Sequence, residues 1–181
     1  NQDILTFDLR TLPKDYVVVA NVPYYITSKI IKYLTTSVNK PRTIVLLIQK
    51  EVAVRLAAEA GDMSILAVSA QIYANVRLGD VVPAALFTPP PKVDSQVDIL
   101  EMHTDPLVGP KQEKAFFRIV KAGFVANRKK LRSSISSGLH ISKDEATALL
   151  TSAGIDADNR AEQLSIADWQ RLVAAAHQAS L

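Results

Sequence analysis

The chain has 181 residues, which suffices for one full domain or two small ones with a sizeable core. Hydrophobic residues make up 48% and charged residues 22%, a composition that excludes a disordered chain. No apolar run is long enough to span a membrane, and the absence of cysteine excludes disulfides, thiolate zinc sites and cysteine nucleophiles. No stretch resembles a signal peptide, so we expect a cytoplasmic protein.

The net charge of +3 hides an uneven distribution of charge along the chain. Residues 111–137 contain eight lysines and arginines against one glutamate, whereas the segments before and after them are slightly acidic. The eight cations are Lys111, Lys114, Arg118, Lys121, Arg128, Lys129, Lys130 and Arg132. A basic segment of this kind indicates a polyanionic partner.

The first half of the chain alternates strand-like and helix-like stretches. Apolar and β-branched runs predict strands at 16–20, 43–48, 76–82 and 93–102, the first of them buried on both faces. Helical patterns begin with a cap at Thr27-Ser28 and recur at 50–60, which ends at Gly61-Asp62, and at 64–74. Strands separated by crossover helices imply an α/β fold with a mainly parallel sheet. The last two strands have no helix between them and are expected to pair antiparallel.

The second half contains only helical patterns. A turn-rich stretch at 106–110 separates it from the first half. The predicted helices cover 112–126, 128–136, 142–153 and 165–178, and Gly123 and Asn127 are expected to loosen or end the first of them. Ser142 before Glu145 and Ser165 before Asp168 are typical of helix N-caps. We therefore expect a small all-α domain attached to an α/β domain.

Asn21-Val22-Pro23-Tyr24 follows the first predicted strand, at the end where open α/β sheets bind ligands. Asn21 offers an amide oxygen, and Pro23 restrains Val22 to an extended conformation that fixes the direction of its carbonyl. Two fixed acceptors beside the ring of Tyr24 suit an exocyclic amino group on a flat base. The alternative is a strand-ending turn with a packed tyrosine, because so short a match is a hypothesis only.

Asn-x-Pro-Tyr after a buried strand is the signature of the amino-methyltransferases, and longer stretches resemble the ribosomal small-subunit (16S) rRNA adenine N6,N6-dimethyltransferases. These stretches follow the family order from Asp3 to the C-terminus: Gln49–Arg55, Phe87–Ser95, Asn127–Arg132 and Arg160–Ser165. The erythromycin-resistance methylases of the large-subunit RNA share the first half of this pattern. The stretch Arg160–Ser165 and the helical tail favour the small-subunit enzymes.

The resemblance implies a class I, Rossmann-like methyltransferase that uses S-adenosylmethionine to dimethylate two adjacent adenines near the 3′ end of small-subunit rRNA. By this similarity Asn21 and the Val22 carbonyl, with Pro23 shaping the turn, hold the target amine, and Tyr24 and Phe87 stack on the two faces of the base. Asp3 and Asn21 are implied on the cofactor side. We accordingly expect the target-base half of the methyltransferase domain at 1–105, a linker at 106–110 and an RNA-binding domain at 111–181.

Contact with the RNA backbone is expected for Lys92 in the proline-rich loop and for Lys114, Arg118, Lys121, Arg128, Lys129, Lys130 and Arg132 of the basic segment. The alternatives are an exposed loop lysine and a solvated helix face. Glu51 and Arg55 are expected to form a surface ion pair at i, i+4 spacing. The three histidines show no metal-ligand spacing, so we expect no metal site.

One departure from the family is large, because the chain opens at Asn1 and contains no Gly-x-Gly. A glycine-rich turn cradles the cofactor in this fold. We therefore expect a fragment that lacks the N-terminal cofactor-binding part and is inactive by itself, with an exposed sheet edge through which it can associate. Two alternatives to the small-subunit dimethyltransferase stay open. If the chain exists as it stands, the first is a non-catalytic RNA-binding or ribosome-assembly module. The second is a large-subunit rRNA adenine methylase.

Overall fold

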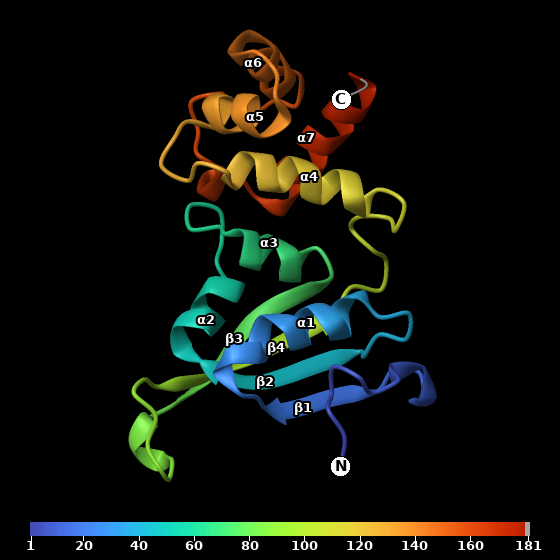
Figure 1. The fold of residues 1–181 in the computed structure, drawn as a ribbon, viewed down its shortest axis with the longest axis vertical. Coiled ribbons are helices and arrows are strands. Elements are labelled where there is room, and N and C mark those ends of the chain that lie inside the picture. The colour runs from blue at the N-terminus through green and yellow to red at the C-terminus, as the bar shows by residue number, and fades with distance from the viewer. Residues whose placement is uncertain (180–181) are drawn as a thin grey trace. The chain divides into compact units, whose positions relative to one another are not determined.

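The computed structural model describes residues 1–179, which form two compact units (Figure 1). The first unit contains residues 1–57 and 69–106. The second contains residues 58–68 and the chain from residue 107 onward. The expected domain limits of 1–105, 106–110 and 111–181 stay a prediction, because two compact units do not show that either part folds alone.

A mixed four-stranded sheet forms the first unit. Its strands lie in the order β1 (Val17–Asn21), β2 (Thr43–Gln49), β4 (Ser95–Met102) and β3 (Ala74–Val82). β1 and β2 are parallel, whereas β4 is antiparallel to both of its neighbours. The expected antiparallel pairing of the last two strands is confirmed. The expectation of a mainly parallel sheet is wrong for the described residues, because β4 returns from β3 without a crossover and enters next to β2.

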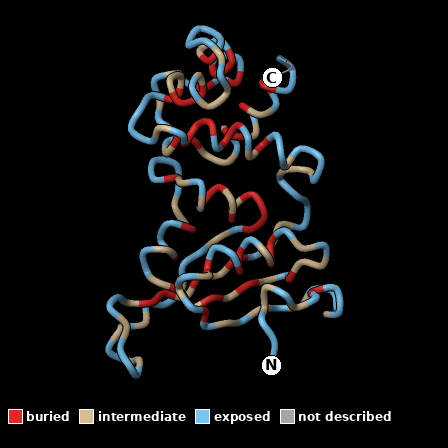
Figure 2. Tube along the Cα trace, viewed as in Figure 1, coloured by how far each residue is buried: buried red, intermediate tan, exposed pale blue. Residues whose placement is uncertain are grey.

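The core of the first unit lies on one face of the sheet, where Ile44, Leu46 and Ile48 alternate along β2 and are completely buried. Figure 2 shows buried stretches of chain in the sheet and in the helices. Helix α2 (Lys50–Leu56) packs on β2, β3 and β4, and α1 (Thr27–Thr36) buries its own apolar side. β1 ends the described sheet, and on the other face its Val19 is 76% exposed, so the expected burial on both faces is wrong. Association through this edge stays a prediction.

Helix boundaries differ from the predicted ones where tertiary contacts intervene. α1 begins at Thr27 and has no side-chain cap. α2 ends at Leu56, four residues early, where the side-chain amide of Gln71 donates to the Leu56 carbonyl at 2.8 Å. The next helix, α3, is Ile65–Gln71. A distant side chain therefore satisfies a carbonyl that a longer helix would have satisfied itself.

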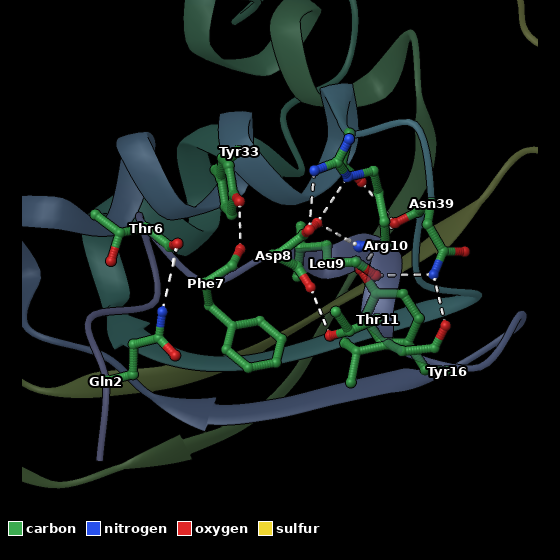
Figure 3. A network of polar contacts seen from close by, with 12 residues as sticks. Gln2, Thr6, Phe7, Asp8, Leu9, Arg10, Thr11, Tyr16, Tyr33 and Asn39 are labelled. Atoms are coloured by element: carbon green, nitrogen blue, oxygen red, sulfur yellow. Dashed lines mark hydrogen bonds and ion pairs between the residues drawn. The ribbon is translucent and has the colours of Figure 1, made fainter.

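The residues before β1 are held by side-chain to backbone hydrogen bonds (Figure 3). The Tyr33 hydroxyl of α1 donates to the Phe7 carbonyl at 2.5 Å. The Asn39 side chain, in the loop after α1, donates to the carbonyls of Leu9 and Leu12 at 2.9 and 3.0 Å. These bonds fix the N-terminal segment, which has little regular structure, against α1 and the loop that follows α1.

Four helices form most of the second unit: α4 (Glu113–Phe124), α5 (Leu131–Leu139), α6 (Lys143–Ser152) and α7 (Ile166–Gln178). Both predicted N-caps are confirmed as capping boxes, at Ser142 with Glu145 and at Ser165 with Asp168. Within the described chain no helix has the length and apolar character to cross a membrane.

Two glycines of the second unit are required by close packing between helices. A Cβ at Gly123 would collide with the ring of Trp169, and a Cβ at Gly138 would collide with the backbone of Ala122. Gly123 is the last residue but one of α4, which ends at Phe124, so the expected end of the helix in the region of Gly123 and Asn127 is confirmed. The lack of a side chain at Gly123 also lets the fully buried Trp169 of α7 pack against α4.

Asp98 interrupts the apolar interior of the first unit. It lies in the middle of β4 opposite Leu46 and Leu78, it is completely buried, and neither carboxylate oxygen has a hydrogen-bond partner in the described chain. Burial disfavours the charged form and raises the pKa of Asp98 to about 7. An ionised carboxylate here costs stability because no donor replaces the lost water.

We predict that Asp98→Asn stabilises the chain only at higher pH. In the unfolded chain Asp98 ionises near pH 4, whereas in the folded chain it keeps its proton up to about pH 7. The free energy of unfolding of the wild type should therefore fall as the pH rises through this window, while that of the variant should not. The difference should reach roughly 2–4 kcal/mol at about pH 8, measured by urea unfolding.

Asp80→Asn is the matched control, because Asp80 is an exposed aspartate on the neighbouring strand β3. It should follow the wild-type pH profile. Equal profiles for the wild type and Asp98→Asn would contradict the buried, unpaired state of Asp98.

Candidate functional site

The turn after β1, Asn21–Tyr24 (the Asn21 turn), presents two hydrogen-bond acceptors that no other group among residues 1–179 uses. Asn21 ends β1 and is exposed, and its side-chain amide makes no hydrogen bond within the described chain. Val22 is buried, and its N–H donates to the Leu47 carbonyl at 3.4 Å, which ties the turn to β2. Pro23 follows and is exposed, and no hydrogen bond to the Val22 carbonyl is found among residues 1–179. The turn can therefore accept two N–H bonds from a bound group.

Tyr24 is held at this turn by a contact with a distant strand. Its ring is half-buried, and its hydroxyl lies 2.7 Å from the Oγ atom of Ser95, the first residue of β4. Ser95 is buried and pairs with Gln49 at the end of β2. The contact joins two stretches that the sequence analysis treated separately. The tyrosine is thus packed, as the alternative interpretation expected, but it is packed at the end of the sheet where the Asn21 turn lies.

Phe87 lies in the loop between β3 and β4 and is half-buried. The loop contains the short helix η3 (Ala84–Leu86) and a cis Thr88–Pro89 peptide bond. The Asp94 carboxylate accepts from the Ala84 N–H at 2.9 Å and closes the base of the loop. No ring contact joins Phe87 to Tyr24 in the described chain. The two rings share one end of the sheet through Ser95, and stacking of both on one base stays a prediction.

Asp3 lies in the N-terminal segment and is exposed. One of its carboxylate oxygens accepts from the Leu5 N–H at 2.9 Å in a local turn. No hydrogen bond joins Asp3 to the Asn21 turn within the described residues. The second carboxylate oxygen of Asp3 remains available to a donor. The role of Asp3 in binding the cofactor stays a prediction.

The start of α2 also belongs to this end of the sheet, which the sequence analysis missed. Lys50 follows Gln49 directly, and its N–H donates to the Asp94 carbonyl at 3.0 Å. The expected ion pair between Glu51 and Arg55 does not form among the described residues. Only the pairing of Gln49 with Ser95 could have revealed this proximity, and strand pairing is not encoded in local sequence.

The basic segment lies in the second unit, and most of its cations are exposed. Lys114, Arg118 and Lys121 are exposed on α4, whereas Phe116 and Val120 of the same helix are buried. Arg128, Lys129 and Lys130 are also exposed, and Arg132 is half-buried. Lys92 is exposed in the first unit. The exposure leaves these cations accessible to a polyanion.

Two of these cations already have an anionic partner. Lys130 and Arg132 both contact the Asp158 carboxylate, at 2.7 and 2.6 Å. The hydrogen bond from Lys130 lowers the pKa of Asp158. Lys129 forms no such pair within the described chain. In the same part of the chain, no cluster of three or more histidine, aspartate or glutamate side chains is arranged to hold a metal ion.

Comparison with known proteins identifies relatives along almost the whole chain. A family model described as "Ribosomal RNA adenine dimethylase" matches residues 1–178. The ribosomal RNA small subunit methyltransferase A of Dehalococcoides mccartyi strain CBDB1 is 39% identical, over 91% of this chain and 59% of the relative. That of Desulfitobacterium hafniense strain DCB-2 is 39% identical, over 97% of this chain and 64% of the relative. The chain thus spans about three fifths of the length of these relatives.

Two solved structures share the fold. A dimethyladenosine transferase from Plasmodium falciparum superposes with a TM-score of 0.80 at 22% identity, over 94% of this chain and 70% of that one. The 23S rRNA methyltransferase ErmE superposes with a TM-score of 0.74 at 24% identity, over 96% of this chain and 69% of that one. The expected Rossmann-like fold class with a following helical part is confirmed.

We predict that Tyr24→Phe lowers the free energy of unfolding by about 1–2 kcal/mol, because it leaves the buried Ser95 hydroxyl without its partner. Tyr25→Phe is the matched control, since the neighbouring tyrosine is 85% exposed, and it should change stability by less than about 0.5 kcal/mol. Urea unfolding of both variants checks the prediction. Equal effects at the two positions would show that the Tyr24–Ser95 bond does not hold the turn.

Proposed function

Because the chain belongs to the ribosomal RNA adenine dimethylase family, we propose that the complete protein carrying it dimethylates N6 of two adjacent adenines near the 3′ end of small-subunit rRNA. The observation that carries this proposal is the Asn21 turn. It presents two unused acceptors at the end of β1 and is tied through Tyr24 and Ser95 to the loop that contains Phe87. This arrangement suits a flat base with an exocyclic amine.

The acceptors act on the amine of the target adenine. The Asn21 side-chain oxygen and the Val22 carbonyl would accept its two N–H bonds. The lone pair of N6 is conjugated into the ring, and two acceptors that favour a pyramidal nitrogen release it for attack without a strong base. Positioning of the amine in line with the methyl group supplies most of the remaining acceleration. The proton lost from N6 can leave to solvent because Asn21 is exposed.

The aromatic residues compensate the cost of extracting the base. A base must leave its stack to enter such a pocket, at a cost of a few kcal/mol. Tyr24 would stack on one face of the adenine and Phe87 on the other, and stacking on an aromatic side chain contributes about 1–3 kcal/mol per base. The Ser95 contact holds the Tyr24 ring in place before the base arrives, so less ordering entropy is lost on binding.

The described residues fit one part of a cofactor site. Asp3 is exposed and keeps one carboxylate oxygen unused, so it would accept from the adenine amino group of S-adenosylmethionine, with Asn21 on the side of the reacting methyl. When bound, S-adenosylmethionine supplies an electrophilic methyl group on its sulfonium. The residues of this chain bind and orient, and Asn21 contributes to the binding of both partners.

The basic segment would contact the RNA backbone. Its exposed cations on α4 and in the following loop can neutralise phosphates, and the helical second unit presents them on a surface opposite its apolar core. Binding of this kind depends on RNA shape and on salt rather than on base sequence.

The proposed activity is tested by methyl transfer from S-adenosylmethionine to undermethylated small ribosomal subunits, with the complete protein that carries this chain. Asn21→Ala should lower the rate by at least about a hundredfold, as expected when one preorganised hydrogen-bonding group is lost from an active site. Asn75→Ala, at an exposed asparagine of β3, is the matched control and should keep the rate. Undiminished transfer by Asn21→Ala would refute the role of Asn21, and transfer to large subunits instead would refute the substrate.

We further predict that Lys129 and Lys130 differ in their effect on RNA binding. Lys129→Gln should reduce the slope of log affinity against log salt by about one unit, because one phosphate contact is lost. Lys130→Gln should reduce it less, because the Lys130 charge is already shared with Asp158. Titration of small-subunit RNA at several salt concentrations measures both slopes. An unchanged slope for Lys129→Gln would mean that Lys129 belongs to a solvated face only.

A further inference from the structure

A cleft of about 610 Å³ lies in the first unit, between α2 and the β3–β4 loop. Its volume falls in the range of about 300–1,000 Å³ that is usual for sites of small ligands. None of its residues belongs to the Asn21 turn. The α2 side of the cleft is formed by Lys50, Glu51, Val54 and Arg55, and the loop side includes Lys92, Val93 and Asp94.

The lining combines apolar surface with positive charge. Val54 and Val93 come from opposite sides and are 47% and 45% exposed, which is high for valine. Three cations face two carboxylates, and one of these, Asp94, is half-buried and already accepts from the Ala84 N–H. A ligand with one flat apolar part and one anionic part matches this lining.

The cleft adjoins the candidate active site through covalent and hydrogen-bonded neighbours. Lys50 and Asp94, which line it, are joined by the 3.0 Å bond from the Lys50 N–H to the Asp94 carbonyl. Gln49 precedes Lys50 and Ser95 follows Asp94, and Gln49 pairs with Ser95 between β2 and β4. Ser95 in turn holds the Tyr24 hydroxyl. One residue pair therefore separates the cleft from the tyrosine at the Asn21 turn.

We propose that this cleft binds the nucleotide adjacent to the target adenine in the RNA strand, with its base against Val54 and Val93 and its phosphate near Lys50, Arg55 and Lys92. The inference rests on the proposed function. A target base that leaves its stack exposes one face of its neighbour to water. The valines cover that face, and the cations hold the phosphate that links the two nucleotides. The cleft thus fixes the strand on one side of the reacting base.

The cleft holds the nucleotide on one side of the target only, and the two target adenines are adjacent. It therefore receives the second target adenine when one of the pair occupies the Asn21 turn, and a flanking nucleotide when the other does. The cleft offers the base apolar surface, so in the first case it accepts an adenine with or without methyl groups on N6.

The test is a cycle between a protein substitution and an RNA modification, with the complete protein that carries this chain. Val54→Asp places a carboxylate in the cleft, and Val38→Asp is the matched control at a valine that is 95% exposed and outside the cleft lining. Each protein is titrated with a small-subunit RNA that carries adenine, or an abasic site, next to the target adenine. Both neighbours of the target are replaced in turn, and affinity is measured by fluorescence anisotropy.

The proposal expects Val54→Asp to bind the adenine RNA about tenfold more weakly than the wild type, a loss within the range of one base contact. For one of the two neighbours, Val54→Asp should weaken the abasic RNA less than the adenine RNA, because only the repulsion between the new carboxylate and the phosphate remains when the base is removed. Arg55→Gln should lower the salt slope by about one unit on both RNAs, because the phosphate remains when the base is removed. Val38→Asp should match the wild type throughout.

The outcomes separate this inference from the proposed function. If the wild type methylates the target adenine but Val54→Asp binds like Val38→Asp, or weakens the adenine and abasic RNAs equally, the cleft does not hold the adjacent base. An unchanged salt slope for Arg55→Gln would overturn the phosphate contact. If the wild type methylates no RNA adenine, the proposed function itself is wrong, and the inference falls with it.

Discussion

The insertion of β4 between β2 and β3 determines where the chemistry of the first unit lies. β4 begins at Ser95, opposite the last residue of β2, so the end of one strand and the beginning of the other share one edge region of the sheet. Tyr24 reaches this region through its hydroxyl, and the backbone of Lys50 reaches it through Asp94. The Asn21 turn, the proline-rich loop and the start of α2 are neighbours only because these two strands pair in this register.

β4 also contains the least favourable feature of the interior. Two residues beyond the buried Gln96, Asp98 is enclosed between Leu46 and Leu78 of the neighbouring strands, and no donor within the described chain reaches it. A buried acid without a partner contradicts the apolar pattern around it, and natural sequences keep few such conflicts. The strand that organises the site is therefore also the one whose stability depends on protonation, because the proton removes the charge that burial penalises.

In the second unit the residues that pack the core and the residues that carry positive charge occupy different positions. Phe116, Val120 and Trp169 are buried in the helical core, and Gly123 and Gly138 allow the helices to approach closely. The cations lie on the exposed positions of the same helix and in the loop after it. Substitution of a surface cation can therefore change the affinity for a polyanion with little effect on the core, whereas a Cβ at either glycine would disturb the core directly.

Local sequence determined the elements and their chemistry. The strands, the two capping boxes, the amphipathic face of α4 and the Asn21-Val22-Pro23-Tyr24 turn follow from patterns over a few residues, because alternation, capping and proline geometry act over that range. The resemblance of the longer stretches indicated the family, and the comparisons confirmed it. The concentration of positive charge in one segment was also visible from composition alone.

Tertiary structure decided the rest, because it depends on contacts between residues that are far apart in the chain. The mixed sheet, the early end of α2 at the Gln71 side chain and the role of Gly123 under Trp169 each need a partner from a distant segment. The same holds for the Tyr24–Ser95 bond, the cleft beside it and the pairing of Lys130 with Asp158. Residue types set which interactions are available, and strand register and helix packing select which of them form.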